Sequence, residues 1–539
     1  MSRPAGSFRL SLVSSLALLA LLPDSLAAQL GPAATQFWSQ DSPGTGATLS
    51  SDAETGRSLA IGDFDCNGIA DLAIGMPGDA VGGNANAGRV LVLYSSHAGP
   101  GTAAPDLLTQ DTPGVEDAVE AGDRFGEALA AGDFDADGCD DLAIGAPQED
   151  LEAPAAVAEA GTVHVLYGSG LGLTVAGDEL FTQDTAGVGG AAQADDHFGA
   201  VLLAADLDLD GDAELVVSAP DEDLEGDPTI TDAGAVHVFL GALGGLSGAA
   251  SLLFVPGDAV LNYVPGDFDH CGAALAAGDF AFGGDVELAL GVPGRAGTLP
   301  TDLAAGEVEV ITNVVGVLTG DALSFTVRQG LNSPGAREAF DRFGAALAAG
   351  DFVGDEHDEL VVGAPGEDLE AVPAESAGAV VVLDLAFGGA TNQIWTQEEL
   401  APEHADPFDR FGAALAVGDF DGDGFPDLAI GAPGESLGAL TDAGIIHVIY
   451  NDAGNGLAAT DRQQWLQTLD PAELGDGFGS VLAAGRLSGH TGEALAIGAP
   501  GEDLAGFADA GGVNTLFSIV LFVDGFESGD SVAWSSTVP

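Results

Sequence analysis

Basic residues are scarce in this sequence, and lysine is absent altogether. The 539 residues contain 12 arginines against 85 Asp and Glu, which gives a formal net charge of −73 at pH 7. Nucleic acids and anionic membranes are recognised through basic patches, so this composition excludes both as partners. Hydrophobic residues make up 46% of the chain, whereas disordered acidic chains are poor in them. We therefore expect a folded protein with an apolar core and an anionic surface.

Cysteine is also rare. The three cysteines, Cys66, Cys139 and Cys271, cannot form a disulfide framework, and one bridge with one leftover thiol is the most that they allow. Cys66 and Cys139 fall within the acidic turns described below. We interpret them there as small, apolar-like fillers, with a redox role as the alternative.

No hydrophobic run is long enough to cross a bilayer. Leu10–Leu22 spans about 13 residues and is too short, but it follows Arg3 and Arg9 and precedes the small residues of Ser25–Ala27. This pattern predicts a signal peptide at residues 1–27. We therefore expect a monomeric chain without a transmembrane segment, either secreted or at the cell surface.

Familiar enzyme signatures are missing as well. The sequence contains no H-E-x-x-H and no Walker loop. The glycine-rich stretch Gly241–Gly248 is not followed by a helical pattern, so it is a very weak candidate for a cofactor loop. We predict no catalytic and no cofactor-binding residues.

A repeated segment organises most of the chain. Two clear copies are GDFDADGCDDLAIGAP, from Gly132, and GDFDGDGFPDLAIGAP, from Gly418. Successive copies start 70, 73, 73, 72, 68 and 67 residues apart, and their first turn positions are Asp63, Asp133, Asp206, Asp279, Asp351, Asp419 and Arg486. In every copy the residue that opens the Gly-Ala-Pro triplet follows 12 residues later. This constant phase indicates one structural unit repeated seven times.

Each unit is expected to form four short strands. Runs of Val, Ile, Leu and aromatic residues are separated by Gly, Pro and Asp, which favours strands over helices. Seven such units predict an all-β fold, a seven-bladed β-propeller with four-stranded blades. The last unit lacks a fourth strand, while an unassigned strand, Phe37–Gln40, precedes the first unit. We therefore expect the N-terminal strand to close the last blade of a propeller at 28–520, followed by a C-terminal tail at 521–539 that is either a sorting segment or a disordered end.

The turn between the first two strands carries the pattern D-x-D-x-[DN]-G-x-x-[DE] in four units. Alternate carboxylates on a tight turn converge on one point, the glycine allows the bend, and the seventh residue offers its carbonyl. An all-oxygen set of this size suits Ca²⁺ better than Zn²⁺ or Cu²⁺. The predicted ligands of four Ca²⁺ sites are Asp63, Asp65, Asn67, Ile69 and Asp71; Asp133, Asp135, Asp137, Cys139 and Asp141; Asp206, Asp208, Asp210, Asp212 and Glu214; and Asp419, Asp421, Asp423, Phe425 and Asp427.

Two alternatives compete with this interpretation. An EF-hand needs a bidentate Glu at position 12, but apolar residues stand there: Ile74, Ile144, Val217 and Ile430. Asp and Gly also favour turns without any metal, although four copies in phase argue against that explanation. The other units serve as internal controls. We expect no metal at the turns of Asp279 and Arg486, and at most a weak site at Asp351, Asp355 and Glu359.

These residues resemble the FG-GAP repeat, the unit of the seven-bladed propeller in integrin α subunits and in many bacterial exported proteins. The Phe-Gly pair starts at Phe125, Phe198, Phe343, Phe411 and Phe478. The first and fourth units depart from it with Thr55-Gly56 and Cys271-Gly272, and Gly-Ala-Pro is intact in four units. The resemblance implies the propeller fold and calcium turns on one face of the disc. It does not transfer a ligand, because propellers host many functions.

Three further sets of residues are candidates for binding. The recurring histidines His164, His237 and His447 are interpreted as repeated strand residues rather than as a binding surface. The arginines before the Phe-Gly pair, Arg124, Arg342 and Arg410, are expected to pair with nearby acids. Long acidic loops on the opposite face form either a solvated rim or a recognition face for a cationic or calcium-bridged partner; they are Gln148–Ala160, Asp221–Ala233, Gly366–Ala377 and Gly501–Ala510.

The sequence thus favours a non-enzymatic, calcium-stabilised propeller that serves as an extracellular binding or adhesion module for a protein or a glycan. The alternative is a secreted hydrolase or lyase that uses carboxylates on the loop face, and a structural surface-layer role is a third hypothesis. An enzyme would gather two or three titratable groups in one pocket, whereas a binding module needs a broad face.

Overall fold

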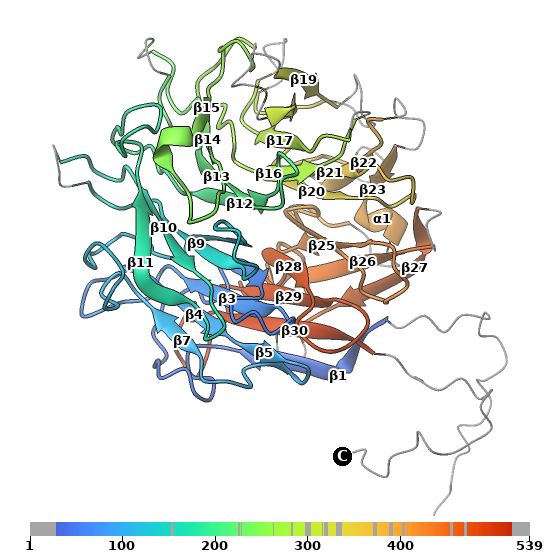
Figure 1. The fold of residues 1–539 in the computed structure, drawn as a ribbon. Coiled ribbons are helices and arrows are strands. Elements are labelled where there is room, and N and C mark those ends of the chain that lie inside the picture. The colour runs from blue at the N-terminus through green and yellow to red at the C-terminus, as the bar shows by residue number, and fades with distance from the viewer. Residues whose placement is uncertain are drawn as a thin grey trace, which may run out of the picture.

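The computed structural model shows seven four-stranded antiparallel sheets arranged as blades in a ring (Figure 1), so the predicted all-β, seven-bladed propeller is confirmed. It describes residues 29–519 apart from the segments 152–155, 225–226, 228, 262, 282–283, 297–302, 315, 317–321, 330–336, 370–374, 387–391, 401–404, 453–455 and 468–471. The signal peptide predicted for residues 1–27 and the tail predicted for 521–539 lie outside the described residues.

The strands follow the repeat. Blade 1 consists of β2 (Leu59–Gly62), β3 (Asp71–Met76), β4 (Arg89–Leu93) and β7 (Asp106–Leu108), with the small hairpin β5 (Ser95–Ser96) and β6 (Gly99–Pro100) inserted. Blade 2 consists of β8 (Ala128–Gly132), β9 (Asp141–Ala146), β10 (Thr162–Tyr167) and β11 (Thr174–Phe181). Blade 3 consists of β12 (Val201–Ala205), β13 (Glu214–Ala219), β14 (Ala235–Phe239) and β15 (Leu252–Phe254), with the 3-10 turn η1 (Gly248–Ala250) before β15.

The second half continues in the same order. Blade 4 consists of β16 (Leu275–Gly278), β17 (Glu287–Val292), β18 (Glu307–Thr312) and β19 (Leu323–Val327). Blade 5 consists of β20 (Ala346–Gly350), β21 (Glu359–Ala364), β22 (Ala379–Leu383) and β23 (Gln393–Trp395), after which comes the short helix α1 (Gln397–Leu400). Blade 6 consists of β24 (Ala414–Gly418), β25 (Asp427–Ala432), β26 (Ile445–Asn451) and β27 (Leu457–Trp465).

The seventh blade closes the ring as the sequence predicts. It combines β28 (Val481–Gly485), β29 (Ala494–Ala499) and β30 (Gly512–Ile519) with the N-terminal strand β1 (Gln29–Trp38). Phe37 pairs with Asn514, and Trp38 with Val513. The closing strand begins before the predicted Phe37–Gln40 segment and ends within it. The first strands of neighbouring blades contact one another around the ring, and β28 contacts β2.

Small residues let the blades approach closely. A Cβ placed on Gly145, the first residue of a Gly-Ala-Pro triplet, would lie only 2.2 Å from the carbonyl oxygen of Gly199 in the next blade. The same clash, at 2.1–2.2 Å, would occur at Gly75, Gly291, Gly363, Gly431 and Gly498. The glycines of the two motifs therefore meet at the junction between blades, which explains why the repeat carries both. The second strand of every blade is buried along its full length.

Candidate metal centres

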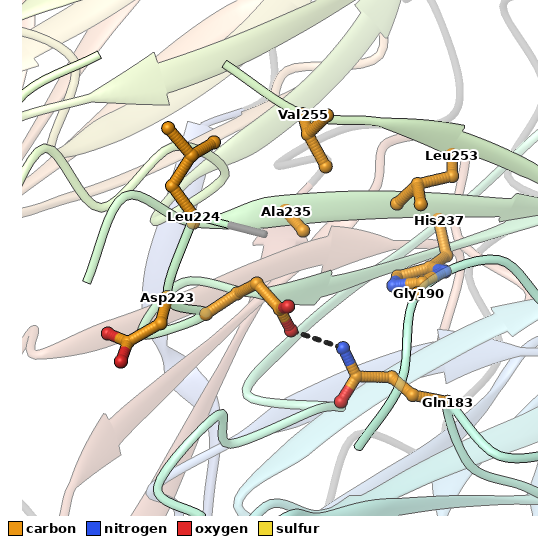
Figure 2. Close-up of a pocket in the computed structure, with 10 residues that line it drawn as sticks. Gln183, Gly190, Asp223, Leu224, Ala235, His237, Leu253 and Val255 are labelled. Atoms are coloured by element: carbon orange, nitrogen blue, oxygen red, sulfur yellow. Dashed lines mark hydrogen bonds between the residues drawn. The ribbon is translucent and has the colours of Figure 1, made fainter. Parts of the chain in front are cut away.

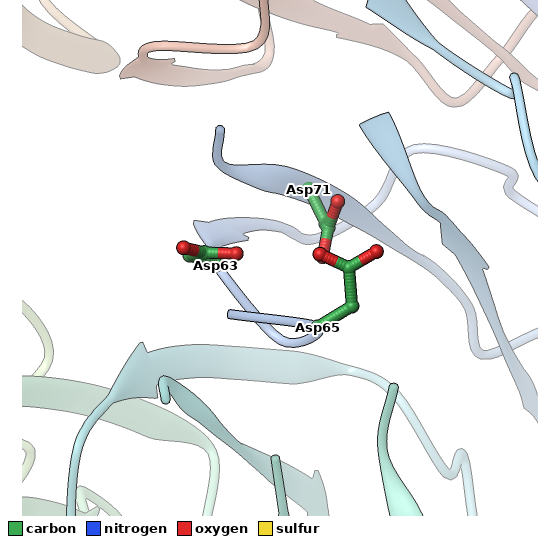
Figure 3. A group of neighbouring side chains, drawn as sticks. All are labelled: Asp63, Asp65 and Asp71. Carbon is green, nitrogen blue, oxygen red and sulfur yellow. The ribbon is translucent and has the colours of Figure 1, made fainter. Parts of the chain in front are cut away.

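The predicted carboxylates converge in the four acidic turns. Figure 3 shows Asp63, Asp65 and Asp71 of blade 1 around one point, with one oxygen of each within 4.8 Å of the others. Equivalent groups occur in three further blades: Asp133, Asp135 and Asp141; Asp206, Asp208 and Asp210; and Asp419, Asp421 and Asp427. Within the described residues of the turns in blades 4, 5 and 7, no three acidic side chains meet in this way.

The first Asp of each turn organises its own loop. The two carboxylate oxygens of Asp63 accept hydrogen bonds from the backbone N–H groups of Asn67, at 2.9 Å, and Gly68, at 2.7 Å. Cys66 and Gly68 adopt positive φ values of 54° and 86°, which favours glycine at the second of these positions. The turn is therefore shaped by its own hydrogen bonds.

The ninth-position acid is buried and has a second role. The carboxylate of Asp71 accepts hydrogen bonds from the N–H groups of Phe64, at 3.0 Å, and Ser95, at 2.6 Å. Burial raises the pKa of Asp71 to about 7 and that of Asp141 to about 8. The desolvated carboxyl is thus costly to ionise without a compensating cation.

Blades 4 and 5 have only part of the pattern but keep this ninth-position acid. In blade 4, Glu287 accepts a hydrogen bond from the N–H of Phe280 at 2.7 Å, and in blade 5 Glu359 accepts one from Phe352 at 2.8 Å. The ninth acid therefore braces the turn even where the third acid is missing, so an acid there does not by itself mark a metal site. The distinguishing feature of blades 1, 2, 3 and 6 is the acid at the third position.

The fifth and seventh turn residues play different parts. Side-chain oxygens at the fifth position accept hydrogen bonds from the seventh-residue N–H, as Asn67 does from Ile69 and Asp137 does from Cys139, both at 2.9 Å. Among the acidic fifth residues, Asp210 of blade 3 belongs to the converging group, where Glu214 stays outside it. The carbonyl ligands predicted at Ile69, Cys139, Asp212 and Phe425 remain predictions.

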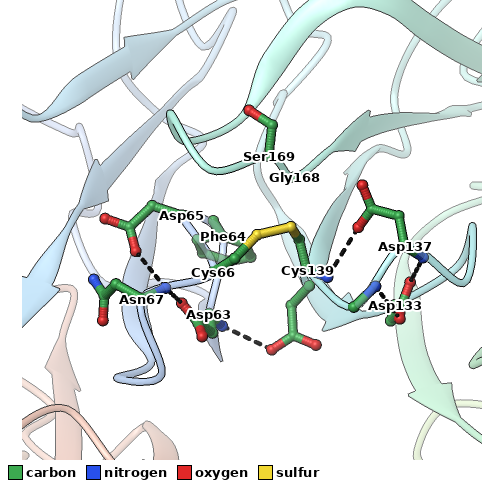
Figure 4. The surroundings of a disulfide bond; sticks show 12 residues. Asp63, Phe64, Asp65, Cys66, Asn67, Asp133, Asp137, Cys139, Gly168 and Ser169 are labelled. Carbon is green, nitrogen blue, oxygen red and sulfur yellow. Dashed lines mark hydrogen bonds between the residues drawn. A yellow bond between two sulfur atoms is a disulfide. The ribbon is translucent and has the colours of Figure 1, made fainter.

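The acidic turns of blades 1 and 2 are covalently joined. Cys66 and Cys139 form a disulfide, with their Cα atoms 4.9 Å apart (Figure 4), so their interpretation as apolar fillers is wrong. The fourth residue of one turn faces the seventh residue of the next, a proximity that depends on how blades pack and not on either turn alone. Cys271 is buried and free. In addition, the backbone N–H of Asp63 donates to Asp140 Oδ2 at 2.7 Å, which ties the same two turns by a hydrogen bond.

A second set of acids, which the sequence interpretation missed, lies on the opposite face. Gln110 donates a hydrogen bond to the buried Glu149 at 2.6 Å, from the fourth strand of one blade to the loop of the next. Burial raises the pKa of Glu149 to about 9. The equivalent hydrogen bond in the next pair of blades is donated by Gln183 to Glu222, and Figure 2 shows Gln183 beside His237. Further copies join Gln329 to Glu367, Gln397 to Glu435 and Gln467 to Glu502. The recurring Gln after the fourth strand is the feature of the sequence that could have indicated these hydrogen bonds between blades.

The recurring histidines belong to the core. His164, His237 and His447 are at most 1% exposed, and each packs against the Phe of a Phe-Gly pair at ring distances of 5.2–5.4 Å. Burial lowers the pKa of His237 and of His447 to about 4. This placement agrees with their interpretation as repeated strand residues.

The three arginines differ from one another. Arg124 contacts Glu54 at 2.6 Å and Glu127 at 2.7 Å, as expected. Arg410 approaches Asp442 only at 3.6 Å, and both side chains are half exposed. Arg342 has no acidic partner among the described residues, contrary to expectation.

Known proteins support the resemblance. The FG-GAP repeat family matches residues 55–93, 125–166, 198–239, 343–383 and 411–449. The chain is 25% identical to phosphatidylinositol-glycan-specific phospholipase D of Bos taurus over 391 residues, which is 70% of this chain and 43% of that protein. It is 33% identical to the Rattus norvegicus protein of the same name over 187 residues, 33% of this chain and 20% of that protein.

Integrin chains are also similar. Integrin alpha-V of Gallus gallus is 30% identical over 250 residues, 44% of this chain and 21% of the integrin chain. This chain therefore spans less than half the length of each of these relatives. No helix within the described part of the chain combines the length and apolar character needed to traverse a membrane.

Proposed function

Because this chain is an FG-GAP repeat protein with a seven-bladed propeller, we propose that it is a calcium-stabilised binding module that acts outside the cell on a protein or glycan partner. Residues 28–520 form its propeller domain, residues 1–27 its signal peptide, and residues 521–539 a separate tail. The observation that supports calcium binding is the convergence of carboxylates in four turns, which recur at the same position of the repeat.

Calcium in these turns acts on stability. Three carboxylates within 4.8 Å repel one another, and Ca²⁺ relieves that repulsion through oxygen ligands. An ion that binds only the folded chain stabilises it by mass action. Since acidic turns of neighbouring blades contact one another, as Asp63 and Asp140 do, the four ions support the disc and leave the opposite face free to bind.

The extracellular location is supported by two features. Structural disulfides persist in oxidising compartments, and Cys66 and Cys139 form one here. The N-terminal sequence has the pattern of a signal peptide. A net charge of −73 keeps such a chain soluble.

An enzymatic role is the second candidate. Several relatives carry the name phospholipase D, and Asp221, an acid of the opposite face, contacts His270 at 2.8 Å. Hydrogen bonding to Asp221 raises the pKa of His270. Burial alone would raise the pKa of Asp221, but hydrogen bonds and charge from His197 and His270 hold it below its usual range. Both shifts favour the charged forms of a stable ion pair rather than a poised acid and base.

One experiment separates the two candidates. The secreted chain is screened against glycan and extracellular-protein arrays with calcium and with chelator, and in parallel against a phosphatidylinositol-glycan substrate. A binding module gives a retained, calcium-dependent partner and no turnover. Turnover that is abolished by His270→Ala would instead support the enzyme.

A further inference from the structure

Three consecutive blades carry a triplet of Phe, Asp and a His or Arg, with the Phe exposed, on the face opposite the acidic turns. The triplets precede the first strands of blades 4, 5 and 6 and are Phe268-Asp269-His270, Phe340-Asp341-Arg342 and Phe408-Asp409-Arg410. The three phenyl side chains are 57%, 56% and 58% exposed, although large apolar side chains in this protein are mostly buried. Each triplet therefore presents a phenyl ring next to a cationic or titratable side chain.

The triplets are held firmly by their surroundings. The middle Asp of each is at most 1% exposed, and Asp269 and Asp409 accept backbone N–H groups of their own loops at 2.7 and 2.6 Å. A Cβ on Gly294 would lie 1.7 Å from the carbonyl oxygen of Phe268, and the phenylalanines of the other two triplets are equally tight against a glycine, at 1.8 and 2.0 Å. The exposed rings thus stand on close-packed backbone, which reduces the entropy lost on binding.

A cavity opens beside the first two triplets. It has a volume of about 440 Å³, and Phe268, His270, Arg342 and Asp221 are among the residues that line it. Cavities of this size accommodate small ligands. Its walls come from loops of blades 3 and 4 and from the start of blade 5, so the site exists only in the assembled ring.

One guanidinium at this cavity, that of Arg342, lacks among the described residues the acidic partner that other arginines have. Several arginines of this chain are paired with acids, as Arg124 is with Glu54 and Glu127. At the cavity the carboxylate of Asp221 contacts both His197, at 2.7 Å, and His270, at 2.8 Å, so these charges are paired among themselves. Arg342 has no acidic partner in the described part of the chain. In a chain with a net charge of −73, a guanidinium without an acidic partner among the described residues is unexpected. Its place in a cavity is consistent with an anionic ligand.

We propose that this cavity binds the carboxylate of an acidic saccharide, with Arg342 as the main contact and Phe268 as the stacking surface. Guanidinium groups recognise carboxylates through paired, charge-assisted hydrogen bonds. The apolar C–H face of a sugar ring packs on the electron-rich face of a phenyl ring. The second and third triplets extend the site to further units of the same ligand, through Phe340, Phe408 and Arg410.

A saccharide fits better than a peptide for two reasons. The triplet recurs with the blades, which matches a ligand built from repeating acidic units. The three phenyl rings are open surfaces rather than enclosed pockets, whereas the anchor side chains of peptides need enclosure. The proposal rests on the proposed binding function and specifies its ligand class.

The test is calorimetric titration of the mature chain, in excess calcium, with a hyaluronan hexasaccharide. Its carboxyl-reduced counterpart and a hexaglutamate peptide are the comparison ligands. We expect the hexasaccharide to bind, and each comparison ligand to bind about tenfold more weakly or worse, the equivalent of one lost charge-assisted contact. Arg342→Gln and Phe268→Ala should each weaken hexasaccharide binding, whereas Arg462→Gln, an exposed arginine on β27, should not.

Three results would overturn the proposal: equal affinity in Arg342→Gln, tighter binding of the peptide, or no binding by a chain whose melting temperature still rises with calcium. The last result separates this proposal from the calcium-stabilised module, because that module would remain intact. A melting temperature that does not change when calcium is added would contradict the proposed function itself. Melting curves of both variants establish that lost binding is not lost folding.

Discussion

Cys66 of blade 1 is bonded through its sulfur to Cys139 of blade 2, so that a covalent link joins two acidic turns 73 residues apart in sequence. Cys66 stands between Asp65 and Asn67, and Cys139 is itself the seventh residue of its turn. The bond therefore restrains two candidate calcium turns at once. Metal binding and the disulfide should support each other.

The double variant Cys66→Ser, Cys139→Ser should be less stable than the parent. Opening a loop of this length costs about 4 kcal/mol in the chain-entropy model, and calcium affinity at the two turns should fall with it. Urea denaturation with and without calcium measures both effects. Adding reductant is the control, because it should destabilise the parent and leave the double variant unchanged. Equal denaturation midpoints would contradict the structural role of the bond.

Removing one carboxylate from a turn should act only when calcium is present. Asp135→Asn deletes a member of the blade 2 group, so the calcium-induced rise in melting temperature should shrink. In chelator the same variant should be no less stable than the parent, because it relieves repulsion between carboxylates. Asp285→Asn, in the turn of blade 4, is the matched control and should keep the full response. A loss of stability in chelator equal to that in calcium would show that Asp135 is merely structural.

The buried acids of the opposite face should make stability fall as the pH rises. Burial raises the pKa of Glu149 to about 9 from its usual value of 4.5. The folded chain then holds a proton that the unfolded chain has released, so the contribution of this group is complete below pH 4.5 and is lost as the pH approaches 9. Between those limits one such group changes the free energy of unfolding by about 1.4 kcal/mol per pH unit.

Glu149→Gln tests this directly, since an amide does not titrate and can still accept the hydrogen bond of Gln110. Urea midpoints measured from pH 6 to pH 9 in excess calcium should decline less steeply in the variant. Parallel curves for the variant and the parent would mean that Glu149 is ionised in the folded state.

The blade junctions should not tolerate a methyl group at the Gly-Ala-Pro glycine. Gly145→Ala places a Cβ 2.2 Å from the carbonyl oxygen of Gly199, so we expect a loss of about 2–4 kcal/mol from the forced separation of two blades. Ser218 occupies the same position in blade 3, and Ser218→Ala should be nearly neutral by comparison. Thermal melts of the two variants check the difference.

Local patterns made much of this protein predictable from its sequence. The repeat specified the number of blades, and the missing fourth strand in the last unit led to the closure by β1. The converging acids at the turns follow from alternate residues on one tight bend, because such neighbours are close whatever surrounds them.

Contacts between blades could not be predicted from the sequence. The Cys66–Cys139 bond, the Gln110–Glu149 hydrogen bond and the lack of an acid beside Arg342 among the described residues all depend on how one blade packs against the next. The spacing of residues along the chain does not give the distance between residues of different blades. The exposure of Phe268 could not be predicted for the same reason. Its neighbour Asp269 is buried, and only the packing of the loop determines which of the two side chains faces solvent.

The most direct test counts the ions. Native mass spectrometry of the mature chain, exchanged into a volatile buffer with trace calcium, should show four bound Ca²⁺ per chain and three in Asp135→Asn. A chain that carries no calcium under these conditions, or whose bound calcium is unaffected by Asp135→Asn and Asp421→Asn, would contradict the assignment of metal to the acidic turns of blades 1, 2, 3 and 6.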